Sequence, residues 1–207
     1  MNQSDGARPG TETTPVFKPL IETEETESVR RSLEVGWLGM GKSVGEFEDA
    51  LSKFLGLKDR HLVALSTGHA ALHLAILSCN FDKGDEIITP SFNNVADFQA
   101  IIASGCKPVF CDIEEQTLGI DPDKIENLIT SRTKAIVCVH MFGYPCKIRE
   151  IKSIAKKHKL ALIEDASHAH GAELDGKKIG TFGDISAFSL HQRKALSVGD
   201  GGMVCTN

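Results

Sequence analysis

The spacing of hydrophobic residues changes along the chain between helical and strand-like patterns. Val44, Phe47, Leu51 and Phe54 recur at steps of three and four residues, which predicts a helix over 44–55. From residue 62 onward, short apolar runs alternate with longer segments of helical spacing. These patterns predict strands at 62–65, 86–89, 108–111, 135–139, 160–163 and 185–190, and helices at 69–79, 95–103, 122–129 and 147–159.

This alternation predicts an α/β fold, in which a mostly parallel sheet has helices on both faces. A last apolar run, residues 203–205, follows a glycine loop and is expected to pair antiparallel with the sheet. Ligands bind such sheets beyond the carboxyl ends of the strands, so the residues that follow strands are the candidates for chemistry. They are Ser66 to His69, Pro90 to Asn94, Asp112, His140, Asp165 to His170, and His191 to Lys194.

The N-terminal segment differs from the rest of the chain. Residues 1–15 are polar and rich in glycine, proline and threonine, which predicts a disordered arm, and residues 21–35 predict a surface helix. Residues 36–43 fit the phosphate-binding pattern G-x-x-x-x-G-K-[ST] of nucleotide hydrolases. That loop must follow a buried strand, whereas residues 22–34 are densely charged and helical in period. The pattern therefore does not favour a nucleotide hydrolase.

Composition narrows the class of protein. The 207 residues are 41% hydrophobic and carry a net charge of -5, which suits one large or two small domains and disfavours general nucleic-acid binding. An anionic small ligand remains compatible with this charge, because a local site can be positive. The six cysteines form no CxxC pair and several lie in apolar runs, as expected for reduced cysteines of a cytoplasmic protein without a zinc site. Without a long apolar run or a signal peptide, we expect no membrane segment.

Two stretches could hold a phosphorylated, covalently bound cofactor. Lys194 lies just after a strand in glycine-rich surroundings, near Arg193 and His191, where desolvation and neighbouring cations would favour a reactive amine. The alternative is an ordinary exposed loop lysine. Residues 66–71 lie between a strand and an apolar helix, where backbone N–H groups can bind an anion. The alternative there is a simple helix cap by Thr67 or Ser66.

Asp165 ends a strand that should be central, and a buried carboxylate needs a cationic partner or a metal. His168 and His170 could bind a metal, but no third ligand is evident and no metal site is expected. The alternative partner is a protonated heterocyclic nitrogen. A phosphate turn, a buried aspartate and a lysine, in that order, are what pyridoxal phosphate needs. We interpret His140 and His73 as structural histidines.

With these residues in place, the chain resembles the DegT/StrS family of pyridoxal-phosphate-dependent nucleotide-sugar aminotransferases, from about Pro19 to Asn207. The motifs that carry the resemblance are GHAALHL at 68–74, GDEIITPSF at 84–92, KPVFCDI at 107–113, RTKAI at 132–136, HMFGYP at 140–145, EDA at 164–166, HGA at 170–172 and FS-x-H-x-x-K at 188–194. Several spaced motifs occur in the order of the family.

The resemblance implies that Lys194 forms the internal aldimine and that Asp165 binds the pyridinium N–H. Residues expected at the cofactor are Gly68, His69, Ala70, Asn94, Asp165, His168, Ser189 and Lys194. The backbone at 69–70 and the Ser189 hydroxyl would hold the phosphate, and His168 would lie against the ring or its O3′. His69 replaces a threonine that is common in the family. Asn94 replaces an aromatic residue that often stacks on the ring, so Phe92 could stack instead, or Asn94 could form a hydrogen bond.

The resemblance also implies the architecture and the reaction. Residues 16–207 would be the large domain of a fold-type-I pyridoxal enzyme, whose C-terminal small domain is missing, and the full-length protein would be a homodimer. The expected reaction moves an amino group from an amino acid, with glutamate as the first choice, to a nucleotide-linked keto-sugar. The alternatives are a sugar dehydratase or lyase on the same scaffold and a non-catalytic fragment. Family members that dehydrate sugars can carry histidine in place of the lysine, so Lys194 favours transamination.

Overall fold

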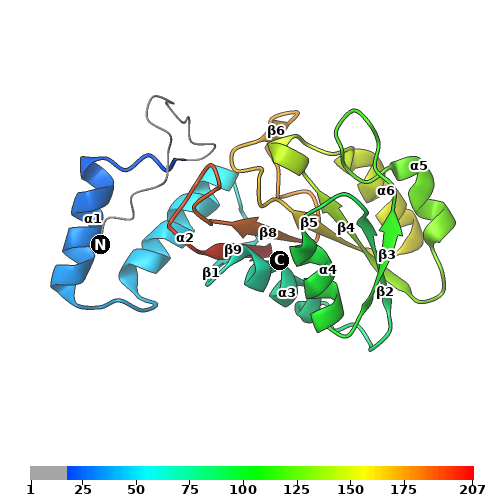
Figure 1. Cartoon of the computed structure of the whole chain (residues 1–207), viewed down its shortest axis with the longest axis horizontal. Coiled ribbons are helices and arrows are strands. Elements are labelled where there is room, and N and C mark those ends of the chain that lie inside the picture. Colours follow the sequence, from blue (N-terminus) through cyan, green and yellow to red (C-terminus); the bar gives the residue numbers. More distant parts are fainter. Residues whose placement is uncertain (1–17) are drawn as a thin grey trace, which may run out of the picture.

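The structure of the chain is a computed structural model that describes residues 18–207 (Figure 1). The arm expected at residues 1–15 lies outside the described residues. Seven strands form one sheet in the order β1-β9-β8-β5-β4-β2-β3. Their bounds are β1 His61–Leu65, β2 Glu86–Pro90, β3 Lys107–Cys111, β4 Thr133–Val139, β5 Ala161–Asp165, β8 Ile185–Ser189 and β9 Gly202–Thr206.

The sheet is mostly parallel, as the sequence predicts. Neighbouring strands from β3 through β2, β4 and β5 to β8 run parallel. The last strand, β9, pairs antiparallel with β8, which confirms the expectation for residues 203–205. β9 also pairs antiparallel with β1, a contact that the pattern of the sequence did not reveal. The final strand thereby joins the first one to the rest of the sheet.

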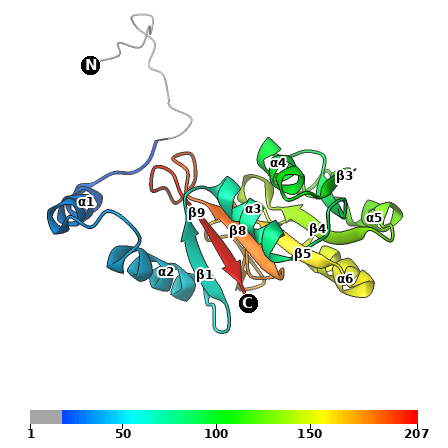
Figure 2. The same ribbon diagram turned by 90° about the horizontal axis from the view of Figure 1, so that it is seen from below.

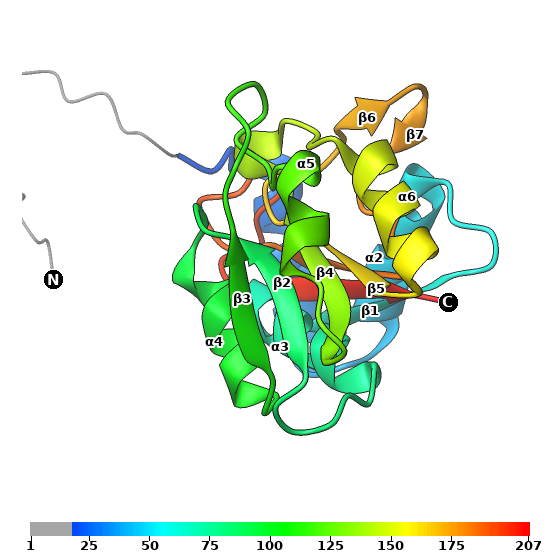
Figure 3. The same cartoon turned by 90° about the vertical axis from the view of Figure 1, so that its right-hand side faces the viewer.

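Helices cover both faces of the sheet (Figure 2, Figure 3). They are α1 Thr23–Val35, α2 Lys42–Leu55, α3 Gly68–Ser78, α4 Val95–Ala103, α5 Pro122–Ile125 and α6 Ile148–His158. Successive residues of a strand point to opposite faces, and Ile87 and Ile88 accordingly belong to two separate cores. One core packs beneath α2, α5 and α6, and the other beneath α3 and α4.

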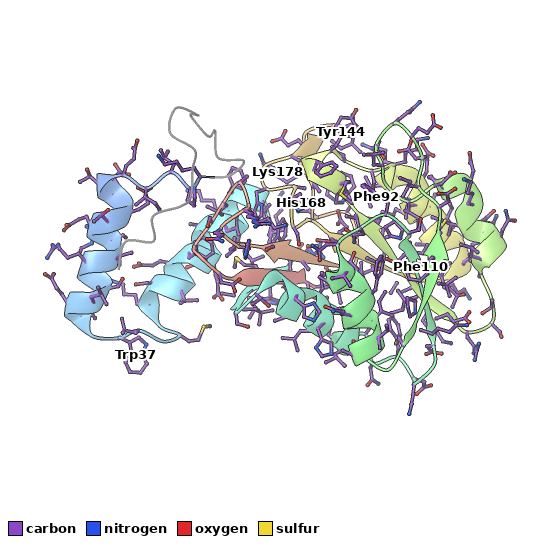
Figure 4. The ribbon with its side chains drawn as sticks, in the orientation of Figure 1. Trp37, Phe92, Phe110, Tyr144, His168 and Lys178 are labelled. Atoms are coloured by element: carbon purple, nitrogen blue, oxygen red, sulfur yellow. The ribbon has the colours of Figure 1, made fainter. Side chains whose placement is uncertain are left out.

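The N-terminal helix α1 stands away from the sheet and contains no buried residue (Figure 1). The loop with the phosphate-binding pattern therefore follows an exposed helix and not a buried strand, as the charged, helical period of residues 22–34 predicts. Trp37 of this loop is 68% exposed and its indole Nε1 donates to the carbonyl of Met40 (Figure 4).

Two local predictions were incomplete. The helix expected over 122–129 begins with Asp121 as its cap and Pro122 in its first turn, but it passes into a 3₁₀ turn at Glu126–Leu128. A hairpin of two short strands, β6 Glu173–Leu174 and β7 Lys177–Lys178, was not predicted. Its signal was the Asp175-Gly176 pair, whose positive φ angles of 51° and 74° suit a two-residue turn. The strands are too short to give a hydrophobic alternation.

Two glycines near this hairpin give a test of the packing. Both have positive φ, but a Cβ on Gly180 would lie 2.2 Å from Cζ of Phe188, whereas a Cβ on Gly176 would meet nothing within 4 Å. We expect Gly180→Ala to lower the free energy of unfolding by about 3 kcal/mol and Gly176→Ala by about 1 kcal/mol. Urea denaturation of both variants measures the difference; equal losses would show that Phe188 does not confine this turn.

Candidate active site

The carboxyl ends of the strands bring the predicted phosphate turn against Ser189. A Cβ on Gly68 would lie 2.6 Å from Cβ of Ser189 and 2.9 Å from its Oγ. Gly202, paired with Ser189 in the sheet, lies against the same turn: a Cβ on it would lie 2.1 Å from the carbonyl oxygen of Thr67. The turn between β1 and α3 thus packs closely against both β8 and β9, and only glycine fits at 68 and 202.

Thr67 is the N-cap of α3, so the capping alternative for this turn is correct as far as Thr67 is concerned. The backbone N–H of Ala70 donates to Thr67 Oγ1 at 2.9 Å. The first N–H groups of a helix have no partners within the helix, so those of Gly68 and His69 remain the donors suited to an anion. The Ser189 hydroxyl, beside Gly68, is buried and accepts a weak hydrogen bond from the N–H of His191 at 3.4 Å.

Asp165, at the end of β5, is the central carboxylate of the site. It is buried, and its Oδ1 accepts the backbone N–H of Ser167 at 2.9 Å. Lys194 follows β8, the neighbour of β5 in the sheet, and is half-buried. Burial lowers the pKa of the Lys194 amine, while the negative charge of Asp165 partly opposes this shift. More of the amine is therefore neutral at a given pH than in an exposed lysine.

Two histidines line the same region. Burial, followed by the positive charge of Lys194, lowers the pKa of His168. The ring of His168 lies parallel to that of Phe142 with centroids 6.2 Å apart. Burial, Lys194 and His168 lower the pKa of His170 to about 4. Both rings are thus neutral near pH 7. His168 lies within the electrostatic reach of Lys194 and Asp165, and its contact with a cofactor stays a prediction.

Asn94 has a structural role that the sequence did not indicate. It is the N-cap of α4, and its Oδ1 accepts the N–H of Ala96 at 2.9 Å. The side chains of Asn94 and Phe92 are both exposed, that of Phe92 to 47%. A contact of either residue with a cofactor ring stays a prediction.

Glu164, next to Asp165, lies on the opposite face of β5 and is fully buried. His140 Nε2 lies 3.1 Å from Glu164 Oε2, and the backbone N–H groups of Gly180, Phe182 and Gly183 donate to the same carboxylate. Burial alone would raise the pKa of Glu164, but the hydrogen bonds from His140 and from the glycine amides outweigh it and lower the pKa. The structural role expected for His140 is confirmed.

A cluster of possible metal ligands adjoins this network. Ligand atoms of Cys138, His140 and Cys146 all lie within 4.8 Å of one another, and all three residues are buried. The N–H of Cys146 lies 3.2 Å from His140 Nδ1, and His140 Nε2 lies 3.1 Å from Glu164 Oε2. Both ring nitrogens are therefore engaged, and a metal would have to displace one hydrogen bond. All six cysteines have free thiols.

Comparison with known proteins agrees with this geometry. Residues 19–207 match the model of the DegT/DnrJ/EryC1/StrS aminotransferase family. The chain belongs to this family. Among family relatives, the GDP-perosamine synthase of Vibrio cholerae is 37% identical over 194 residues, which are 93% of this chain and 52% of the relative. The chain thus spans about half the length of the curated relatives that it matches.

Solved structures of the family have the same fold. The aminotransferase PseC of Helicobacter pylori, involved in the biosynthesis of pseudoaminic acid, superposes with a TM-score of 0.87 at 35% identity, over 93% of this chain and 52% of that one. The putative sugar aminotransferase Spr1654 of Streptococcus pneumoniae, in its PLP form, gives 0.89 at 27% identity, over 93% and 53%. The chain is thus a partial large domain of the pyridoxal-phosphate aminotransferase fold. No helix within residues 18–207 is long and apolar enough to cross a membrane.

The buried Glu164 gives a prediction for stability. We expect Glu164→Gln to lower the free energy of unfolding by about 3 kcal/mol, because an amide nitrogen would face backbone donors that now bind a carboxylate. The pKa of Glu164 is lowered on folding from 4.5, so its contribution is complete above about pH 4.5 and is lost as the pH falls through the folded-state value. Urea denaturation from pH 7 to acid should show the difference in the free energy of unfolding between the unaltered chain and Glu164→Gln becoming smaller. Glu150→Gln, at an exposed position, is the control and should leave the stability nearly unchanged.

Proposed function

We propose that the chain is the cofactor-binding large domain, over residues 16–207, of a pyridoxal-phosphate-dependent aminotransferase that acts on nucleotide-linked keto-sugars, with Lys194 as its cofactor lysine. The observation that carries the proposal is the placement of Lys194 and Asp165 at one edge of the sheet, close enough for the charge of Asp165 to act on the amine. Family membership and relatives that are named as sugar aminotransferases support it.

The residues present fit the proposed cofactor. Gly68 and Ser189 lie close together, so the backbone N–H groups at the amino end of α3 lie beside the Ser189 hydroxyl. This set of donors suits a phosphate. Asp165 is a carboxylate at a buried strand end, which suits a protonated ring nitrogen. When bound, pyridoxal phosphate supplies an aldehyde that bonds to an amine and a ring that accepts electrons.

The protein side of the reaction follows from the same residues. The lowered pKa of Lys194 raises the fraction of neutral amine at a given pH, and this amine can bond to a carbonyl and, once released, take up and return a proton as general base and acid. Asp165, held by the Ser167 N–H, would keep the ring nitrogen protonated. His168, neutral and stacked on Phe142, would position the ring without adding charge.

The substrates and the assembly are part of the proposal. We propose glutamate as the amino donor, a sugar linked to a nucleoside diphosphate as the acceptor, and a homodimer as the complete enzyme. A cytoplasmic location is proposed from the six free thiols, which are typical of proteins in a reducing compartment. Product analysis with glutamate and keto-sugars tests the reaction, and products of dehydration instead of amination would favour the dehydratase alternative.

Lys194→Ala tests the assignment of the lysine. We expect the variant to lose the visible absorbance that pyridoxal phosphate acquires when it bonds to a lysine amine, and to lose all amino transfer in the full-length protein. Lys157→Ala, which removes an exposed lysine paired with Glu126, is the matched control. Spectra that Lys194→Ala leaves unchanged would refute the assignment.

A second pair of variants compares the contributions of Asp165 and His168, which are proposed to lie at the ring of pyridoxal phosphate. Asp165→Asn should reduce the transfer rate of the full-length protein by at least about a hundredfold, because it removes the charge that stabilises a protonated ring nitrogen. His168→Asn should cost much less, since the neutral imidazole only positions the ring. Steady-state rates measure both, and equal losses would contradict the ranking.

A further inference from the structure

Two fully buried carboxyl groups of this molecule have opposite surroundings. Glu164 accepts hydrogen bonds from His140 and from three backbone N–H groups. Asp97, in the first turn of α4, is only 1% exposed and has one donor, the side-chain amide of Asn93, which binds Oδ2. Within residues 18–207, its buried Oδ1 has no hydrogen-bond partner. A buried carboxylate needs several donors or a cation, and Asp97 has neither.

The charges around Asp97 do not supply the missing partner. Its helix packs on α3, β2 and β3. The titratable side chains of these elements and of the nearby end of β5 are His69, His73, Glu86, Lys107, Cys111 and Asp165. Glu86 and Lys107 form an ion pair with each other at the amino ends of their strands, 3.3 Å apart. Of this set, only Asp165 acts on Asp97, and burial followed by its negative charge raises the pKa of Asp97 well above the ordinary value.

The dipole of α4 opposes this rise in the pKa of Asp97. An acidic group in the first turn of a helix is stabilised by the helix dipole, but by about 1 kcal/mol or less. Removing a carboxylate from water without compensating hydrogen bonds costs several times more, roughly 2–7 kcal/mol even for an uncharged polar group. Burial therefore prevails at Asp97.

Asp97 and Asp165 belong to the same layer of the molecule. Ile87 and Ile163 pack in the core beneath α3 and α4, and side chains two residues apart in a strand share a face. Thr89 and Asp165 therefore point toward the layer that contains α4. The Thr89 hydroxyl is buried and, within residues 18–207, has no partner, so it gives Asp97 no second donor.

We propose that Asp97 is a positioning residue of the cofactor site, which keeps a proton at neutral pH so that Asp97 and Asp165 together carry one negative charge. The proposal rests on the proposed function, because that single charge would face one protonated ring nitrogen. When two nearby carboxyl groups share one proton, the better-solvated one ionises. Asp165 accepts the Ser167 N–H and lies near Lys194, so the charge belongs to Asp165 and the proton to Asp97.

Infrared spectroscopy of the 207-residue chain without cofactor tests the proton directly. A protonated carboxyl group has a carbonyl stretching band that a carboxylate lacks. We expect such a band at pH 7 in the unaltered chain and its loss in Asp97→Asn. Asp123→Asn, at an exposed position, should leave the band in place. A band that Asp97→Asn does not remove would overturn the proposal.

The coupling to Asp165 gives a signature that a purely structural role would not produce. In Asp165→Asn the neighbouring charge is gone, so the Asp97 band should disappear on titration at a lower pH than in the unaltered chain. An unchanged titration would show that the two groups do not share a charge. If Asp165→Asn loses its native circular dichroism, the same titration is made with Asp165→Ser, which removes the charge with a smaller side chain.

Cofactor titration then separates this proposal from the proposed function. With the Asp165 charge gone, less opposes the ionisation of Asp97, and a protonated ring nitrogen would favour it, so Asp165→Asn should retain weak affinity for pyridoxal phosphate. Adding Asp97→Asn should weaken that affinity by about tenfold more, a change that absorbance or equilibrium dialysis measures. Equal affinities of the single and double variants would overturn the role of Asp97. Failure of the unaltered chain to bind pyridoxal phosphate would instead contradict the proposed function, while the infrared result would still decide the state of Asp97.

Discussion

The buried Glu164 carboxylate is the interaction on which the carboxyl edge of the sheet depends. It joins β5 to the end of β4 through His140 and to the 180–183 turn through three backbone amides. The charge is tolerated in the core because every donor is fixed by the backbone or by a histidine whose other nitrogen is also bonded. The strand end so fixed also carries Asp165, whose carbonyl accepts the N–H of His140.

Alternation along one strand gives two adjacent carboxylates different tasks. Glu164 faces the core beneath α6 and is saturated with donors, whereas Asp165 faces the layer of α3 and α4 and keeps capacity for a ligand. Asp97 shares that second layer without the donors that Glu164 has. On one face of the sheet, hydrogen bonds stabilise the charge of Glu164. On the other face, by our proposal, Asp97 keeps its proton beside the charged Asp165.

Much of the fold could be predicted from hydrophobic spacing. The seven main strands and the longer helices lie within a few residues of their predicted ranges, because each buries an apolar face with a regular period. The β6–β7 hairpin was missed because two-residue strands carry no period. Among the candidate site residues, Asp165 and Lys194 were singled out because they follow predicted strands, and Ser189 because of the resemblance to the family. Asp97 was not, because an acidic residue in a first helical turn is normally only a favourable end of a helix.

The sequence by itself determined the α/β class, the family and the candidates at the strand ends, since these depend on local patterns and spaced motifs. Only the tertiary structure decided that β9 joins β1 to β8, which brings the Gly68 turn into close contact with Ser189. It also decided that Thr67 occupies the Ala70 amide and that Asp97 lies buried near Asp165. These contacts depend on which strands become neighbours and on which distant side chains are buried beside one another. The spacing of residues within one segment determines neither.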